Sequence, residues 1–281
     1  MKTEEIKQIV RLALNEDIRT GDITTSAVFK NDITSKASFI AKQDGVIAGL
    51  KLAEYIMAEV DDTVVFQQYV NDGDFIKVGD LIADCTGPSA SILIAERTIL
   101  NFMQRMSGIA TLTNLFCKAV NSSHTKILDT RKTLPGHRYL DKIAVKAGGG
   151  ENHRYCLDDM YLIKENHISV AGGISEAISR CMEHKRTNAL EAKIEIEVGS
   201  IAELKEALSC DGVDIIMLDN MSIEDMKQAV EINAGKVKLE ASGNMSLERV
   251  SAVASTGVDF ISVGVITHSA QALDISLLFE K

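Results

Sequence analysis

The sequence of 281 residues predicts an α/β protein in which an α+β N-terminal region precedes an incomplete (β/α) barrel. Three observations predict this class. Residues 35–86 contain short alternating segments separated by turn signals, residues 91–120 have the spacing of one long helix, and strand-like and helix-like segments alternate after residue 124. The first pattern is typical of an antiparallel sheet, and the last is typical of a parallel sheet covered by helices.

The N-terminal region begins with a predicted amphipathic helix. Ile6, Ile9, Val10 and Ala13 fall on one face of a helix drawn through the first seventeen residues. The segments that follow are rich in apolar and β-branched residues, and Asp-Gly and Gly-Asp pairs mark turns among them: KASFIAK, GVIAG, DTVVFQQYV and DLIADCTG. We expect these four segments to form antiparallel strands.

Residues 91–120 predict a long helix with two distinct faces. The apolar face has the spacing i, i+4, i+7: Ile99, Met103 and Met106. The polar face has the spacing i, i+4, i+8: Arg97, Asn101 and Arg105. Gly108 lies inside this pattern, where a glycine indicates either a break or a close contact with another segment.

Six short apolar segments after residue 124 predict the strands of the second region: TKILDT, DMYLIK, KIEIEV, VDIIMLD, VKLEAS and DFISVG. Helix-like stretches such as SIAELKEALSC, SIEDMKQAVEIN and SLERVSAVAST separate several of them. Six units are fewer than the eight of a complete barrel. The barrel is therefore incomplete, or two strands are too weak to recognise in the sequence.

The composition excludes several classes of protein. A net charge of −10 disfavours nucleic acid as the main partner, because binding to a phosphate backbone needs a basic surface. The sequence has no signal-peptide pattern and no apolar run of the ~20 residues that cross a bilayer. Its five cysteines are scattered, odd in number and without CxxC spacing, which argues against a disulfide framework and a zinc site. We expect a cytoplasmic protein.

Every predicted strand ends in a polar or special residue on its carboxyl side. In chain order these strand ends are Asp129, Thr130, Arg131 and Lys132; Lys164 and Glu165; Glu195 and Glu197; Asp219; Glu240 and Ser242; and Gly264. The carboxyl ends of barrel strands converge on one face, where active sites lie. One charged strand end is usually only a solvent boundary, but a series that alternates cations and carboxylates predicts a catalytic or ligand-binding site.

The two signs of charge limit the ligand. Ten Lys, Arg and His residues fall within residues 129–167 of this acidic chain, and they suit carboxylates or phosphates. Glu197 and Asp219 accept hydrogen bonds only, so they suit sugar hydroxyls or hydrated Mg²⁺. The glycine-containing stretches AGGGENH, ASGN and SVG offer backbone amides to an anion. Together these features predict a phosphorylated sugar substrate and a metal ion.

Several stretches, in the same order along the chain, resemble quinolinate phosphoribosyltransferase: NEDIRTGDIT, ERTILNFMQRMSGIAT, DTRKTLPGHRYLDKIAVKAGGGENHR, LIKENH, IEIEV, IMLDN, EASGN and ISVG. The resemblance implies an α/β sandwich-like domain over residues 1–110 and an incomplete barrel over residues 111–265. Residues 266–281 are expected to pack back on the first domain. It also implies a homodimer with shared active sites, or a hexamer of such dimers.

The resemblance implies a reaction between quinolinate and phosphoribosyl pyrophosphate, with Mg²⁺ as cofactor. Residues matched to the binding of the two quinolinate carboxylates are Arg131, Arg154 and Lys164, with Arg97 from the neighbouring subunit. Lys132 and Lys164 match residues that neutralise phosphate, and Glu197 and Asp219 match those that hold the ribose hydroxyls and Mg²⁺. These four, Lys132, Lys164, Glu197 and Asp219, form the implied catalytic set. The remaining substrate contacts are implied at Thr130, His153, Ser242, Gly243, Asn244, Val263, Gly264 and Val265.

Some positions have a second interpretation or depart from the family pattern. His153 contacts substrate, caps a helix or orients Arg154, and Arg97 could be only an exposed helical arginine. Arg105, Arg138 and Glu165 either contact the ligand or shape the site indirectly. His167 and His268 are expected to be structural. Glu165 replaces an expected aspartate, and Cys156 and Asn244 replace expected glycines. No charged residue of the implied site is lost.

Three other functions remain as alternatives. A Schiff-base lyase or aldolase on a (β/α) barrel would use Lys164 as its nucleophile. A related phosphoribosyltransferase would use a different acceptor and would be expected to differ in its arginines. A binding or regulatory protein with this fold would be expected to have lost Lys132, Lys164, Glu197 or Asp219, and all four are present.

Overall fold

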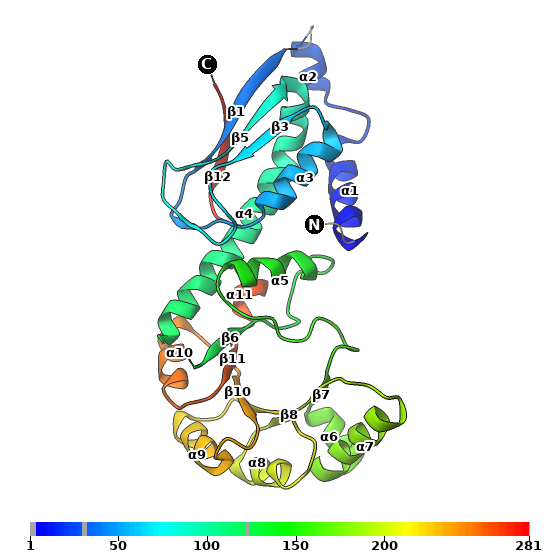
Figure 1. Ribbon diagram of the computed structural model, residues 1–281, viewed down its shortest axis with the longest axis vertical. Coiled ribbons are helices and arrows are strands. Elements are labelled where there is room, and N and C mark those ends of the chain that lie inside the picture. Colours follow the sequence, from blue (N-terminus) through cyan, green and yellow to red (C-terminus); the bar gives the residue numbers. More distant parts are fainter. Residues whose placement is uncertain (1–3, 30–32, 122–123, 281) are drawn as a thin grey trace. The chain divides into compact units, whose positions relative to one another are not determined.

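The computed structural model describes residues 4–29, 33–121 and 124–280 (Figure 1). The chain forms two compact units. Unit 1 comprises Met1–Asn114, Thr133–Gly149 and Ile266–Lys281, and unit 2 comprises Leu115–Lys132 and Gly150–Val265. The domain boundaries that the sequence suggests at residues 110 and 265 stay a prediction. Among the described residues, no helix is long and apolar enough to cross a membrane.

Unit 1 is built on a four-stranded antiparallel sheet in the order β12-β1-β5-β3. Its strands are β1 (Thr34–Ala41), β3 (Val65–Gln68), β5 (Leu81–Pro88) and β12 (Ile275–Phe279). A separate two-stranded pair joins β2 (Gly45–Val46) to β4 (Phe75–Ile76). The predicted antiparallel strands are confirmed, and β12 is an additional strand supplied by the C-terminal segment.

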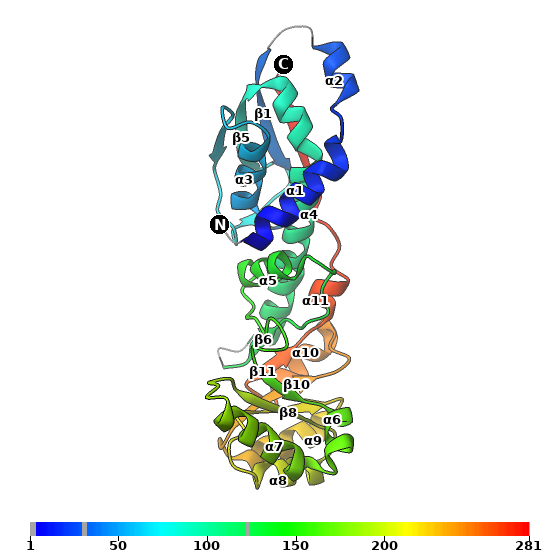
Figure 2. The same ribbon diagram turned by 90° about the vertical axis from the view of Figure 1, so that its right-hand side faces the viewer.

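Helices of unit 1 lie beside this sheet or beyond its ends (Figures 1 and 2). They are α1 (Glu4–Ile18), α2 (Ile23–Val28), α3 (Leu50–Val60), α4 (Ser89–Val120), whose last residues belong to unit 2, and α5 (Arg138–Ala147). The predicted N-terminal helix corresponds to α1, and residues 1–3 lie outside the described residues. The predicted long helix corresponds to α4, where Ile99, Met103 and Met106 are buried as expected.

Gly108 does not break α4, which is continuous from Ser89 to Val120. Instead the glycine allows the C-terminal segment to pack on the helix. A Cβ atom at this position would lie 1.9 Å from the backbone oxygen of Gln271. Leu273 N donates a hydrogen bond to the carbonyl of Gln104 on the same helix at 2.9 Å. The close contact, rather than the break, is the correct interpretation of this residue.

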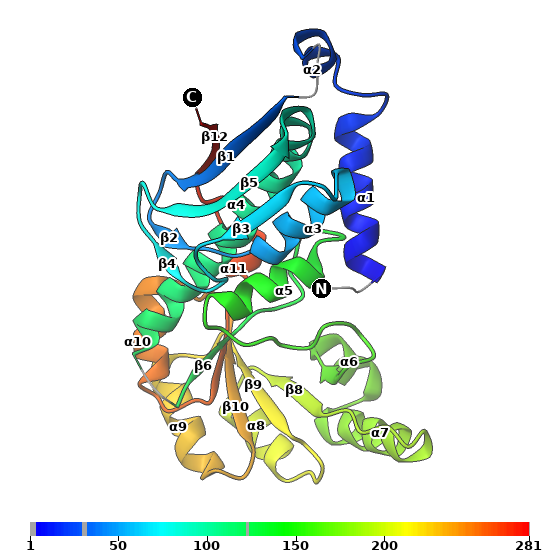
Figure 3. The ribbon, with the colours of Figure 1, turned by 45° about the horizontal axis from the view of Figure 1, so that its top comes forward.

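Unit 2 is an open, parallel six-stranded sheet in the order β6-β11-β10-β9-β8-β7 (Figure 3). Its strands are β6 (Lys126–Leu128), β7 (Tyr161–Ile163), β8 (Ile194–Val198), β9 (Ile215–Asp219), β10 (Lys238–Ser242) and β11 (Phe260–Ser262). All six predicted strands are therefore confirmed, as are the α/β class and the incomplete barrel.

Helices follow most of these strands: α6 (Glu165–Ala171), α7 (Ile174–Thr187), α8 (Ile201–Leu208), α9 (Ile223–Asn233), α10 (Leu247–Ala254) and the short α11 (Val265–His268). Serine caps begin two of them, since Ser200 accepts a hydrogen bond from Glu203 N and Ser222 accepts one from Asp225 N. Each serine lies within a few residues of the end of the preceding strand, β8 for Ser200 and β9 for Ser222. The strand ends are therefore joined to rigid helices by short loops.

We expect Gly108→Ala to lower the free energy of unfolding by about 2 kcal/mol or more, because its methyl group would displace the Gln271 backbone. Chemical denaturation measures the change. Asn101→Ala, an exposed substitution in the same helix, is the control and should change stability by less than about 0.5 kcal/mol. Equal stability of the two variants would show that the C-terminal segment does not pack on Gly108.

Candidate active site

Parallel pairing brings the polar strand ends of unit 2 to one edge of the sheet. Each strand enters this edge with its carboxyl end, because all the neighbouring pairs are parallel. The predicted site residues at this edge are Thr130, Arg131, Lys132, His153, Arg154, Lys164, Glu165, Glu197, Asp219, Ser242, Gly243, Asn244, Val263, Gly264 and Val265. Arg97, Arg105 and Arg138 belong to unit 1.

Asp129 anchors the first cations of the site. The residue has no exposed surface, and its Oδ1 accepts a hydrogen bond from His153 N at 2.9 Å. The backbone of Glu151 also pairs with Ile127 and Asp129 beside β6. These contacts hold the segment that carries His153 and Arg154 next to the end of β6.

Arg131 and Arg154 lie close enough for their charges to interact. Burial, and then the neighbouring Arg131, lower the pKa of the Arg154 guanidinium. Arg154 donates to the carbonyl of Met160 at 3.1 Å, while the buried Nε of Arg131 has no hydrogen-bond partner in the described part of the chain. Two partly buried guanidinium groups that repel each other would be stabilised by an anionic ligand.

Lys164 and Glu197 connect the ends of β7 and β8. The Lys164 ammonium contacts Glu197 Oε2 at 2.7 Å, and the lysine side chain is 47% exposed. The backbone N–H of Lys164 donates to His167 Nδ1 at 3.0 Å, at the start of α6. His167 thus caps a helix, while exposed Glu165 occupies the first turn of that helix.

A chain of amide side chains connects the ends of β9 and β10. Asn244 donates to Asn220 Oδ1 at 3.0 Å, and Asn220 donates to Asp219 Oδ2 at 2.8 Å. Asn220 and Asn244 have φ values of 54° and 48°, a backbone region that asparagine tolerates better than most residues. Asn244 therefore adopts the left-handed backbone conformation that a glycine would also adopt. Its hydrogen bond to Asn220 helps to orient Asp219.

The loops after β10 and β11 differ in what they offer a ligand. Gly243 has a φ of 93°, and a Cβ there would lie 2.1 Å from Asn220 Oδ1. Gly264 and Val265 are partly exposed. Val263 is buried, and its N–H donates to the Leu128 carbonyl at 2.9 Å. Val263 therefore helps to pair β11 with β6, and the partly exposed Gly264 and Val265 follow it.

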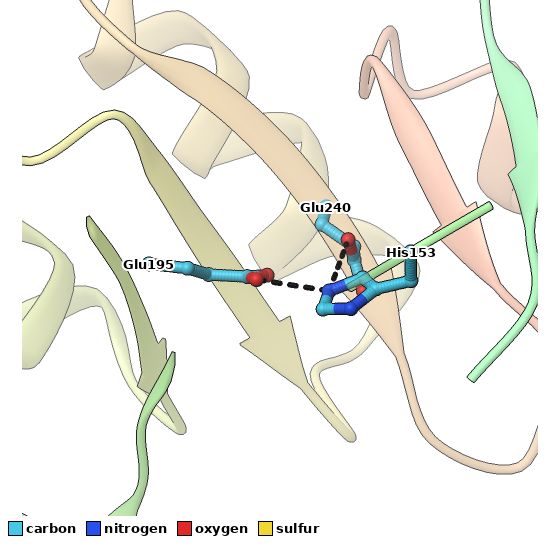
Figure 4. Close-up of side chains that lie close together, drawn as sticks. All are labelled: His153, Glu195 and Glu240. Atoms are coloured by element: carbon cyan, nitrogen blue, oxygen red, sulfur yellow. Dashed lines mark hydrogen bonds and ion pairs between the residues drawn. The ribbon is translucent and has the colours of Figure 1, made fainter. Parts of the chain in front are cut away.

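A buried cluster of three side chains lies beneath the strand ends (Figure 4). His153 Nε2 is 2.9 Å from Glu195 Oε2 and 3.5 Å from Glu240 Oε2. Both carboxylates have no exposed surface. Burial is the main cause that raises the pKa of Glu195 to about 7 and the pKa of Glu240 to about 8.

Glu195 and Glu240 lie at predicted strand ends, but neither belongs to the site that the sequence predicts. The strand β8, IEIEV, contains the signal that could have found Glu195. Ile194, Ile196 and Val198 alternate with Glu195 and Glu197, so both carboxylates lie on the same face of the strand. Only the structure shows that one of them is buried and the other is partly exposed.

The arginines of unit 1 have separate environments. Arg105 forms a bidentate ion pair with buried Asp141, at 3.1 Å from Nε and 2.8 Å from Nη2. Arg138 Nε donates to Thr133 Oγ1 at 3.2 Å. Arg97 is exposed on α4. The first two are thus held by groups of their own unit, and Arg97 is accessible.

A cavity of about 600 Å³ lies beside β7. Arg154 contributes to its wall, but most of the lining is apolar, including Tyr161, Ile163, Val170 and Ala177. This lining contrasts with the charged strand ends. The cavity therefore reaches the site only at Arg154, and it does not contain the residues predicted to bind phosphate.

We expect Arg105→Met to lower the free energy of unfolding by about 2–4 kcal/mol, because it leaves the buried Asp141 carboxylate without its partner. Denaturant titration at neutral pH measures this effect. Arg97→Met is the matched control on the same helix, and its exposed side chain should change stability by less than about 0.5 kcal/mol. If the two variants unfold at the same denaturant concentration, the Asp141 ion pair does not stabilise unit 1.

Two family profiles match nearly the whole chain. The N-terminal domain of quinolinate phosphoribosyl transferase matches residues 22–107, and the C-terminal domain matches residues 109–278. Among curated proteins, the chain is 46% identical to quinolinate phosphoribosyltransferase [decarboxylating] 2b, mitochondrial, of Nicotiana tabacum, over 98% of this chain and 82% of that protein. It is 38% identical to the probable nicotinate-nucleotide pyrophosphorylase [carboxylating] of Bacillus subtilis, over 97% and 93%.

Solved structures agree with this result. The nicotinate-nucleotide pyrophosphorylase of Francisella tularensis superimposes with a TM-score of 0.94 at 42% identity, covering 100% of this chain and 98% of the other. A similarity of this extent includes both units and the loops that follow the strands of unit 2. The chain belongs to the quinolinate phosphoribosyltransferase family.

Proposed function

We propose that this enzyme transfers the phosphoribosyl group of phosphoribosyl pyrophosphate to the ring nitrogen of quinolinate and removes one carboxylate as CO₂. The products are nicotinate mononucleotide, pyrophosphate and CO₂, so the reaction is a step of NAD synthesis. Membership of the family supports the reaction. The single structural observation that carries it is the interaction between the charges of Arg131 and Arg154, two partly buried cations that lie near each other at the strand ends.

The two arginines suit the two carboxylates of quinolinate. A guanidinium group can bind a carboxylate through two parallel hydrogen bonds, which fixes the plane of the ring as well as its position. Lys164 adds a third cation at the end of β7, the strand that follows Arg154 in the chain. Holding both carboxylates would point the ring nitrogen toward the sugar carbon that it attacks.

The substitution and the decarboxylation follow in order. A bond forms from the ring nitrogen to C1 of the ribose as the bond from C1 to the pyrophosphate oxygen breaks. The bond from the ring to the adjacent carboxylate then breaks, CO₂ leaves, and the electron pair stays on the ring carbon until it takes a proton. Lys132 and Lys164 would neutralise phosphate charge, and the cations around the ring would stabilise the electron pair.

Glu197 and Asp219 suit the ribose and the metal ion. They lie at the ends of the neighbouring strands β8 and β9, and both are partly exposed. As carboxylates they accept hydrogen bonds from ribose hydroxyls, and they are the oxygen ligands that Mg²⁺ prefers. The pair therefore fits Mg²⁺, which when bound with the co-substrate would neutralise charge on the departing pyrophosphate.

The loops after β10 and β11 would hold the 5′-phosphate. The partly exposed backbone of Ser242, Gly243 and Gly264 is consistent with amide donors directed at an anion. Thr130 and His153 would complete the substrate contacts from the β6 side of the site. Arg105, Arg138 and Glu165 would act indirectly.

We also propose a homodimer in which Arg97 of one subunit enters the site of the other. The exposure of Arg97 and the family resemblance support this arrangement, and a hexamer of such dimers is compatible with it. We place the enzyme in the cytoplasm, as the scattered, unpaired cysteines suggest.

The Schiff-base alternative is less well supported by the structure. A lysine nucleophile must react as an uncharged amine. The Lys164 nitrogen instead contacts a carboxylate at 2.7 Å and is open to solvent, an environment suited to an ammonium ion. Lys164 is therefore better suited to binding an anion.

We expect the purified protein to form nicotinate mononucleotide and CO₂ from quinolinate, phosphoribosyl pyrophosphate and Mg²⁺. Arg131→Ala and Lys164→Ala should each lower kcat/KM by at least about a hundredfold, because each removes a cation from the ligand. Lys227→Ala, an exposed substitution on α9, should have no effect. The reaction is refuted if the folded wild-type protein forms neither product.

We expect Arg97→Ala and Arg131→Ala to be inactive separately and to complement each other when mixed. In a dimer with shared sites, half of the molecules would be hybrids with one intact site, so activity should recover to about one quarter of wild type. The measurement is turnover after subunit exchange. No recovery, with hybrid dimers demonstrated by mass spectrometry, would mean that Arg97 serves its own subunit.

A further inference from the structure

Glu240 is a fully buried ionisable residue of the strand-end region, and the proposed chemistry assigns it no part. It lies on β10, while Glu195 lies on β8, and β9 separates the two strands. Neither carboxylate has exposed surface, and the His153 side chain between them is 7% exposed. Figure 4 shows both carboxylates directed at the same imidazole nitrogen.

The cluster contains more acceptors than donors. His153 Nε2 contacts Glu195 Oε2 at 2.9 Å and lies farther from Glu240 Oε2, at 3.5 Å. Among the described residues, no side chain or backbone group forms a hydrogen bond of ordinary geometry with Glu195 Oε1 or with either oxygen of Glu240, although the Ser262 hydroxyl faces Glu240. Buried acceptors without donors are strongly destabilising, and a second buried negative charge is more so.

The surrounding charges favour ionisation of Glu195 over ionisation of Glu240. Glu195 is stabilised as an anion by Arg154 and Lys164, although Glu197 opposes them. The groups that face Glu240 are Glu195 from β8, His153 from the segment beside β6, and Ser262 from β11. Only His153 among these can bring a positive charge. One proton added at Glu240 would remove a charge and supply the missing donor.

We propose that Glu240 is a positioning residue that works as a neutral carboxylic acid beneath the active site. Its O–H group donates to the Glu195 carboxylate, which in turn holds the imidazole of His153 in place. The cations at the strand ends then face one negative charge from this cluster rather than two, and they retain more of their attraction for a dicarboxylate substrate. This inference rests on the proposed function for its substrate. Burial, and then the charge of Glu195, raise the pKa of Glu240 to about 8, which agrees with a protonated side chain at neutral pH.

The proposal predicts a loss of substrate binding in alkaline solution. Above pH 8 Glu240 loses its proton, a second negative charge appears in the cluster, and the dianionic substrate is repelled. We expect the KM for quinolinate of the wild-type enzyme to rise about tenfold between pH 7 and pH 9, with a smaller change in kcat.

Glu240→Gln is the test, because an amide has the shape of a carboxylic acid and donates without ionising. At pH 7 its kcat and KM should be within about twofold of wild type, and its KM should stay flat to pH 9. Glu195→Gln is the comparison. It removes the anion that holds His153, so it should weaken turnover at pH 7 by tenfold or more. A Glu240→Gln enzyme that is folded yet a hundredfold less active at pH 7 would overturn the proposal.

A second measurement does not depend on turnover. A carboxyl group whose pKa is raised in the folded state keeps its proton there while the unfolded chain loses it, so its contribution destabilises the fold as pH rises from about 4.5 to 8. The Tm of the wild-type protein should therefore fall by several degrees more than that of Glu240→Gln between pH 5 and pH 9. Parallel curves would contradict the proposal.

Metal analysis tests whether a bound cation, instead of a proton, neutralises the cluster. The ligand atoms of His153, Glu195 and Glu240 lie within 4.8 Å of one another, so a divalent cation could replace the proton. Tightly bound metal that is present in the wild-type protein and absent from Glu240→Gln would overturn the proposal. If wild-type protein shows no turnover, the proposed function fails, and the stability curves still test the protonation of Glu240.

Discussion

The parallel pairing of six strands in unit 2 is the constraint on which the rest of the site depends. Because β6 to β11 all point the same way, every charged residue that ends an apolar strand meets its counterparts at one edge. An antiparallel sheet would have divided the same residues between two edges. Short capped loops, as at Ser200 and Ser222, then return each chain to a helix and keep these ends close to the sheet.

The edge contains two electrostatic layers. The upper layer has cations that repel each other, as Arg131 and Arg154 do, together with the partly exposed carboxylates Glu197 and Asp219. The lower layer has the buried carboxylates Glu195 and Glu240 with His153 between them. A small, doubly charged anion would stabilise the upper layer, while protonation of the lower layer limits the negative charge beneath it. The two layers therefore act on the same ligand.

The strands and the polar strand ends could be predicted from the sequence, because short apolar segments stop at charged residues in a repeating way. Other features depend on partners far away in the chain. The C-terminal strand β12 pairs with β1, and the amphipathic stretch of α3 was hidden between turn signals. The burial of Glu240 and the ion pair of Arg105 with Asp141 could not be predicted, because the spacing of charged residues does not show which of them the fold buries or which distant residue each one contacts.

A comparison of two acceptors shows whether Arg131 and Arg154 bind both carboxylates of the substrate. Quinolinate carries both carboxylates, and nicotinate lacks the one beside the ring nitrogen, so their ratio of kcat/KM measures what the paired cations contribute. With phosphoribosyl pyrophosphate and Mg²⁺ saturating, we predict that quinolinate is preferred by at least about a hundredfold. Equal use of the two acceptors would show that Arg131 and Arg154 do not bind the second carboxylate.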